Sequence, residues 1–317
     1  MGRLIDGLHH VTAISSSIQN NIDFYAGVLG LRLVKQTVNF DAPEVYHFYY
    51  GTETGAPSTL LTFFPYQGLI NGRQGKGTAS TTGFSADLAA MDYWLQRLKK
   101  FNIPYKKPQQ RFPDEIVVYF EDEDGLGLEL VFNEKDNRPG WNNTIIPKAY
   151  SIKGLYHVEL WLDRAELTMN LFTDQLDHTV IRQSGNRTRL ATADAPGHYI
   201  DLISTPESLK GLAGSGTVHH IALKATGPAA QETIRQRVIG RGLAPTPVKD
   251  RNYFTSVYFR EPGGVLLEVA TATPGFTTDE PPEALGMHLM LPPQFEHQRK
   301  HLTAILPPFK NNWSQFK

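Results

Sequence analysis

The sequence contains no cysteine among its 317 residues. This absence excludes a disulfide framework, an iron–sulfur cluster, a zinc site with thiolate ligands and a cysteine nucleophile. Any metal that the protein binds must therefore be held by nitrogen and oxygen ligands, which restricts the candidates to side chains such as histidine, aspartate and glutamate.

An excess of one charge is also missing, because 31 lysines and arginines are balanced by 32 aspartates and glutamates. A net charge of -1 gives no electrostatic footprint for nucleic acid or for an anionic membrane. No apolar run is long enough to span a bilayer, and the first residues lack the apolar core of a signal peptide. We therefore expect a soluble cytoplasmic protein with no nucleic-acid partner and no membrane partner.

What the sequence does contain is a fourfold repeat. Four segments with alternating apolar residues open the repeats and are expected to be strands, at residues 7–14, 80–86, 154–160 and 217–223. Each is followed by a stretch with apolar residues at helical spacing, at residues 20–28, 89–101, 165–175 and 229–241. Strand-like runs bounded by glycine and proline complete each repeat. The predicted unit is one strand, one helix and about three strands.

One such unit leaves a half-buried sheet with free edges, which must pair with another copy to be stable. The expected fold is therefore of the α+β class, with four βαβββ modules forming two curved mixed-sheet barrels. A linker rich in proline, glycine and asparagine at residues 133–151 divides the chain into an N-terminal domain of two modules, residues 1–140, and a C-terminal domain of two modules, residues 150–272. In the proline-rich tail, residues 273–317, a helix over residues 295–306 is expected to pack on the body.

The positions at which the repeats differ chemically are the candidates for a site. Histidine occurs in the opening strand of modules one, three and four, and a carboxylate occurs in the closing strand of modules two, three and four. These residues are His10, His157 and His220, and Glu129, Asp201 and Glu268. Because alternate residues of a strand share a face, paired modules can direct two imidazoles and one carboxylate into one cavity. Such a triad leaves about three of six coordination positions open for substrate and dioxygen, as in non-haem Fe(II) oxygenases.

Which three residues form the triad depends on which modules pair. If neighbours in sequence pair, the ligands are His157, His220 and Glu268; if module one pairs with module four, His10 replaces His157. Modules one and four share a double histidine, His9-His10 and His219-His220, whereas module three has Tyr156-His157. This shared pair favours the triad of His10, His220 and Glu268.

The opening Gly-Leu-His-His-Val-Thr and the closing Glu-Pro-Gly-Gly-Val-Leu-Leu-Glu resemble the vicinal oxygen chelate superfamily. More narrowly, the whole chain is similar to its hydroquinone-type ring-cleaving dioxygenases, which include quinone-resistance proteins of Gram-positive bacteria. The resemblance implies that His10, His220 and Glu268 bind Fe(II), with Mn, Zn or Ni as alternatives. It also places Arg251 and Tyr258 over the substrate, and His9, Thr12 and His219 close to the site.

The function expected from this resemblance is Fe(II)-dependent opening of hydroquinone-type rings with dioxygen, in quinone and hydroquinone detoxification. The partners are then a small aromatic substrate and dioxygen, and the general frequency of dimers favours a homodimer. Three alternatives stay open: a catechol-type extradiol dioxygenase, a glyoxalase-like isomerase or thiol transferase, and a binder of aromatics without catalysis. The roles of His157, Glu129 and Asp201 are also open.

Overall fold

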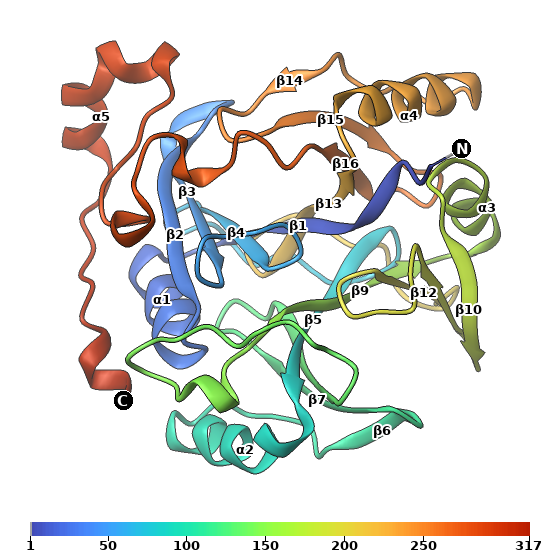
Figure 1. Cartoon of the computed structure of the whole chain (residues 1–317), viewed down its shortest axis with the longest axis horizontal. Coiled ribbons are helices and arrows are strands. Elements are labelled where there is room, and N and C mark those ends of the chain that lie inside the picture. The colour runs from blue at the N-terminus through green and yellow to red at the C-terminus, as the bar shows by residue number, and fades with distance from the viewer. Residues whose placement is uncertain (1) are drawn as a thin grey trace.

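Each of the four repeats folds as a βαβββ module in the computed structural model, which describes residues 2–317 (Figure 1). Module 1 contains β1 (Ile5–Ser15), α1 (Ile18–Ile22), a π-helical segment (Asp23–Val28), β2 (Arg32–Asn39), β3 (Ala42–Gly51) and β4 (Leu60–Pro65). Module 2 contains β5 (Thr78–Asp87), a 3-10 turn (Leu88–Ala90), α2 (Met91–Lys100), β6 (Gln109–Phe112), β7 (Glu115–Glu121) and β8 (Gly127–Asn133).

The second half of the chain repeats this order. Module 3 contains β9 (Gly154–Leu162), α3 (Glu166–Gln175), β10 (Thr179–Ser184), β11 (Arg187–Ala191) and β12 (Tyr199–Ser204). Module 4 contains β13 (Thr217–Ala225), α4 (Pro228–Gly240), β14 (Lys249–Asp250), β15 (Thr255–Arg260) and β16 (Leu266–Ala270). The tail carries α5 (Arg299–Ile305), and further 3-10 turns lie at Lys148–Tyr150, Phe276–Thr278, Pro282–Ala284, Pro293–Gln298 and Trp313–Phe316.

The modules pair into two eight-stranded mixed sheets. The first sheet has the order β14-β15-β16-β13-β1-β4-β3-β2 and the second has the order β10-β11-β12-β9-β5-β8-β7-β6. The α+β fold of four modules in two curved sheets is therefore confirmed. The two expected domains, residues 1–140 and 150–272, stay a prediction, and the sheets are built across the linker between them. The antiparallel pairs β1–β13 and β5–β9 join module 1 to module 4 and module 2 to module 3, so each sheet takes one module from either side of the linker.

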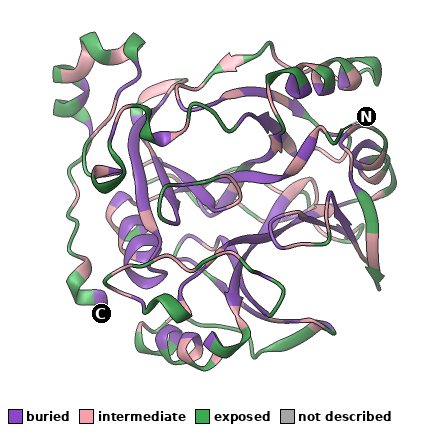
Figure 2. Ribbon diagram, in the orientation of Figure 1, coloured by how far each residue is buried: buried purple, intermediate pink, exposed green. Residues whose placement is uncertain are grey.

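The strands of each sheet alternate between an apolar core face and a polar face. On β1, Val11 and Ala13 belong to the core, whereas His10 and Thr12 face the other side. The inner strands are buried along most of their length, and helices α2 and α4 bury only one side (Figure 2). Each sheet therefore presents a polar concave surface over a closed apolar layer. None of the helices in residues 2–317 combines the length and apolar character that crossing a membrane requires.

The tail packs along β2, one of the two edge strands of the first sheet. The backbone N–H of Met290 donates to the carbonyl of Gln36 on β2, and the side-chain amide of Gln36 donates to the carbonyl of Gly286. Leu302 of α5 is buried in the main core. The helix begins at Arg299 rather than at residue 295, because Pro293–Gln298 forms a 3-10 turn, which is common at the start of an α-helix.

A buried ion pair joins this tail to the sheet and gives a first prediction. The ammonium group of Lys35, fully buried on β2, donates to Asp279 at 2.7 Å and also to Glu280. Glu280→Ala is expected to lower the free energy of unfolding by about 3 kcal/mol, because it leaves a buried charge without one of its partners. Urea unfolding measures this loss. The control is Glu283→Ala, which changes an exposed carboxylate nearby; an equal loss in both variants would contradict the prediction.

Candidate metal centre

Three side chains from three strands meet in the middle of the first sheet. His10 on β1 and Glu268 on β16 lie opposite Ala222 of β13, one on each side, and His220 precedes Ala222 by two residues on the same face. Nε2 of His220 lies 3.2 Å from Nε2 of His10 and 2.9 Å from Oε2 of Glu268, and the His10–Glu268 distance is 3.4 Å. All three side chains are buried.

The chemistry of these three atoms fits a divalent metal ion. Oε2 of Glu268 is buried without a hydrogen-bond partner, and an orphaned carboxylate oxygen is costly unless a cation accompanies it. Burial alone would raise the pKa of Glu268, but the neighbouring His10 and His220 hold it well below its ordinary value, so the carboxylate is anionic. Two imidazole nitrogens and one carboxylate oxygen form the donor set of a facial triad.

The first histidine of each pair, His9 or His219, lies within hydrogen-bond distance of the histidine that follows it. Nδ1 of His9 lies 2.9 Å from Nδ1 of His10, and Nδ1 of His219 lies 2.8 Å from Nδ1 of His220. Burial and the adjacent imidazole lower the pKa of His9 to about 3 and that of His219 to about 4, so both rings are neutral. An unprotonated Nδ1 of His9 or His219 can accept a hydrogen bond from the Nδ1–H of the histidine that follows it. His10 or His220 then carries its proton on Nδ1, and its Nε2 lone pair is free for a metal.

Thr12 lies opposite His220 across β1 and β13. Its hydroxyl is 2.7 Å from the hydroxyl of Thr62, which in turn is 2.9 Å from Nε2 of His47. Thr62 is the module 1 residue that stands where Glu268 stands in module 4, since each pairs in parallel with the residue two positions after the histidine. The fourth position of the cup is therefore a neutral hydroxyl.

Arg251 and Tyr258 line a cavity beside these residues. Tyr258 pairs with Glu268 across β15 and β16, and the edge of its ring faces His220 with the centroids 5.7 Å apart. The Nε–H of Arg251 donates to the hydroxyl of Tyr258 at 3.1 Å, and its Nη2 donates to Asp41 at 3.0 Å. Burial, followed by the charge of Glu268, raises the pKa of Tyr258, so its hydroxyl keeps its proton and can donate a hydrogen bond.

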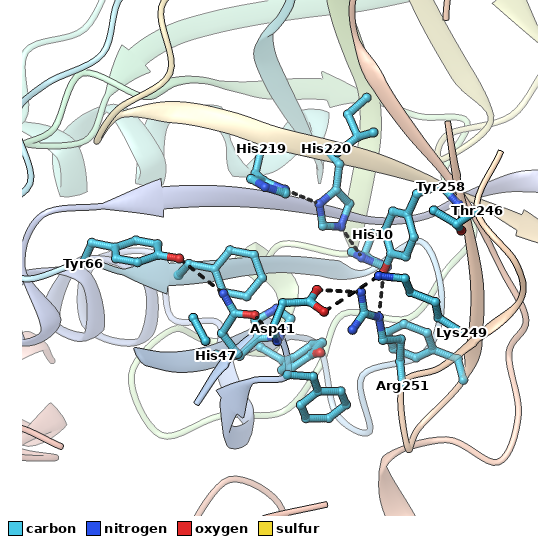
Figure 3. A pocket seen from close by; sticks show the side chains of 17 residues that line it. His10, Asp41, His47, Tyr66, His219, His220, Thr246, Lys249, Arg251 and Tyr258 are labelled. Atoms are coloured by element: carbon cyan, nitrogen blue, oxygen red, sulfur yellow. Dashed lines mark hydrogen bonds and ion pairs between the residues drawn. The ribbon is translucent and has the colours of Figure 1, made fainter. Parts of the chain in front are cut away.

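The cavity of about 380 Å³ shown in Figure 3 is lined by the side chains of His10, His219, His220, Arg251 and Tyr258. Its walls mix polar and aromatic side chains from modules 1 and 4, and such a mixture is typical of a small-molecule site. Sequence analysis did not single out His47 of β3 or Asp41 of the β2–β3 turn, both of which line it. No motif marks them, because the fold alone places His47 beside Thr62 and Asp41 beside Arg251.

The structure does not bring the neighbour-pairing triad together. His157 lies on β9 in the second sheet, whereas His220 and Glu268 lie in the first. Nε2 of His157 is 2.9 Å from Oε2 of Glu129, and its Nδ1 is 3.5 Å from Asp201. The second sheet thus has a cup of its own, in which His157 lies beside both Glu129 and Asp201, the three residues whose roles were open.

Two sheets of paired βαβββ modules, with a cup of two histidines and one glutamate, define a glyoxalase-like class of protein. Residues 7–130 and 154–269 match the family described as the Glyoxalase/Bleomycin resistance protein/Dioxygenase superfamily. The chain belongs to this superfamily, which confirms the resemblance found in the sequence.

Relatives match the chain over nearly its whole length. MhqO of Bacillus subtilis (strain 168), which carries the name of a ring-cleaving dioxygenase, is 42% identical over 310 residues, 98% of either chain. A chlorohydroquinone/hydroquinone 1,2-dioxygenase of Sphingobium indicum is 32% identical over 95% of this chain and 96% of its own. A crystal structure of a Bacillus subtilis protein named as a dioxygenase superposes with a TM-score of 0.93 at 42% identity, covering 98% of this chain and 99% of that one.

Proposed function

We propose that this protein is an Fe(II)-dependent dioxygenase that opens the ring of a hydroquinone-type substrate. The observation that carries the proposal is the convergence of the ligand atoms of His10, His220 and Glu268, two of which, His10 and His220, line a cavity of about 380 Å³. The names of the relatives support ring cleavage, and the donor set supports Fe(II). Removal of hydroquinones would then serve detoxification, because these compounds oxidise to reactive quinones.

The proposed reaction retains both atoms of dioxygen and needs no other reductant. The bond between the hydroxylated ring carbon and its neighbour breaks, the first carbon becomes a carboxylate, and an unsubstituted neighbour becomes an aldehyde. When bound, the metal supplies Lewis acidity toward a phenolic oxygen and a path for electrons between the ring and dioxygen.

The residues of the chain position the substrate and manage its charge. The Tyr258 hydroxyl, still protonated, donates a hydrogen bond to the substrate oxygen beside the ligands. The guanidinium of Arg251 cannot act as a base and instead stabilises negative charge that develops on the ring oxygens. Phe64 and Phe254 of the cavity wall hold the ring and exclude water.

Oxygen uptake tests this function. Protein purified anaerobically and loaded with Fe(II) is expected to consume one dioxygen per methylhydroquinone, while catechol under the same conditions gives much slower uptake. Metal-free protein is the control and should consume none. Preference for catechol would instead support bidentate extradiol chemistry, and no uptake despite one bound metal would point to an isomerase, a thiol transferase or a binder.

A further inference from the structure

The second sheet contains a cup whose positions correspond one by one to those of the metal cup, although one of its residues differs in chemistry. In the first sheet, His10 and Glu268 flank Ala222; in the second sheet, His157 and Glu129 flank Gly83 in the same way. Two residues before the flanked position the first sheet has His220, and the second has Thr81. The copy therefore keeps one imidazole and the carboxylate and has lost the second imidazole.

The wall of the cup is copied as well. Tyr119 lies opposite Glu129 across β7 and β8, as Tyr258 lies opposite Glu268 across β15 and β16. Gln109 pairs with Val117, and Lys249 pairs with Ser256, in each case two residues before the tyrosine, so Gln109 and Lys249 are equivalent. Arg111 follows Gln109 by two residues, as Arg251 follows Lys249. The copied cup has a cavity of about 340 Å³, close in size to the first.

The two arginines occupy different places. Nη1 of Arg111 lies 2.6 Å from Oε2 of Glu129 and its Nη2 lies 3.1 Å from Nε2 of His157, so the guanidinium donates to both. These are the equivalents of two of the ligand atoms in the first cup. An ion bonded to both atoms would sit about 2.0–2.2 Å from each and would collide with this guanidinium.

The buried negative charge of the second cup also explains why a positively charged side chain is present there. Four buried carboxylates face one another there, and three guanidinium groups stand between them. The carboxylates are Glu115, Glu129, Glu159 and Asp201, and the arginines are Arg111, Arg187 and Arg189. Such a group of carboxylates requires compensating positive charge, which arginine supplies without losing its proton.

We propose that Arg111 stands in place of the metal ion, so that the second cup is a metal site closed by an internal guanidinium. Removal of this guanidinium converts the second cup into a site for a divalent cation. The ligands of that site would be Glu129, His157 and Glu159, whose ligand atoms lie within 4.8 Å of one another.

The first cup stays open because Arg251 is held away from its ligands. Asp41, in the two-residue turn between β2 and β3, binds Nη2 of Arg251 at 3.0 Å. The corresponding turn of module 3 is Gly185-Asn186, which offers no carboxylate to Arg111. A carboxylate at the mouth of the cup thus distinguishes an arginine that lines the cavity from one that fills it.

Counting bound Mn(II) tests the proposal. Dialysed wild-type protein is expected to bind one Mn(II) per chain, and Arg111→Ala is expected to bind two. The matched control is Arg251→Ala, the same change in the first cup, which should still bind one. Adding His157→Ala to Arg111→Ala should return the count to one. Electron paramagnetic resonance separates bound from free Mn(II) and gives the counts.

The outcomes separate this proposal from that of the first metal centre. A second Mn(II) in the wild type that His157→Ala removes would overturn it, as would a folded Arg111→Ala that gains none. If Arg111→Ala fails to fold, Arg111→Gln is substituted, which removes the charge and keeps an N–H donor. Absence of any Mn(II) from the wild type would count against the centre at His10 and His220, while the difference between wild type and Arg111 variant would still decide the second cup.

Discussion

His10→Ala is expected to abolish metal binding, whereas His157→Ala leaves it nearly intact. The two histidines occupy equivalent positions in the two sheets, yet Nε2 of His10 faces His220 and Glu268, while Nε2 of His157 accepts a hydrogen bond from Arg111. Replacement of residues that only support a ligand costs about 10–100-fold in metal affinity, and loss of a ligand should cost more. Metal content after dialysis measures the difference.

The comparison of these variants controls for damage to the fold. Both replace a buried histidine on a central strand, so a general loss of packing should affect them alike. Thermal unfolding of the metal-free proteins shows whether each variant still folds. Equal loss of metal from both, or none from either, would refute the assignment of the ligands. Loss from His157→Ala alone would place the metal in the second sheet.

The sequence was sufficient to predict the modules because each repeats its own pattern of strand, helix and strands. The helix expected at residues 165–175 is α3, Glu166–Gln175, and that expected at residues 229–241 is α4, Pro228–Gly240. About three strands were predicted after each helix, but strands without clear alternation, such as β10 with its mostly exposed residues, were not located in the sequence. The shared double histidine favoured the pairing of module one with module four, and β1 and β13 do pair in the first sheet.

The residues of the site also divide into those that the sequence could predict and those that only the fold brings together. His10, His220 and Glu268 could be proposed because they interrupt a repeated pattern with groups that bind metals. Their distances agree with that proposal, but the roles of His47 and Asp41 follow from the pairing of β3 and the turn before it. The guanidinium in the second cup was equally hidden, because Arg111 lies on the short strand β6, for which no strand was predicted.

Tyr258→Phe is expected to keep the metal and to lower kcat for methylhydroquinone by about 10²-fold, the usual effect of removing one hydrogen-bond donor that acts in the transition state. The phenyl ring retains the packing against His220, and Arg251 keeps its bond to Asp41. The change therefore removes one hydroxyl and little else. Steady-state oxygen uptake, with metal content measured on the same samples, gives the effect.

Tyr119→Phe is the matched control, since Tyr119 occupies the same register position in the second cup. Its hydroxyl donates to Glu121 at 2.7 Å and belongs to the second cup, which does not contain the proposed ligands, so its removal should leave kcat unchanged. If both variants turn over at the wild-type rate, Tyr258 has no part in the reaction. If Tyr258→Phe raises KM while kcat stays constant, the hydroxyl binds substrate and transition state equally, and the charge on the opening ring must then be stabilised by Arg251.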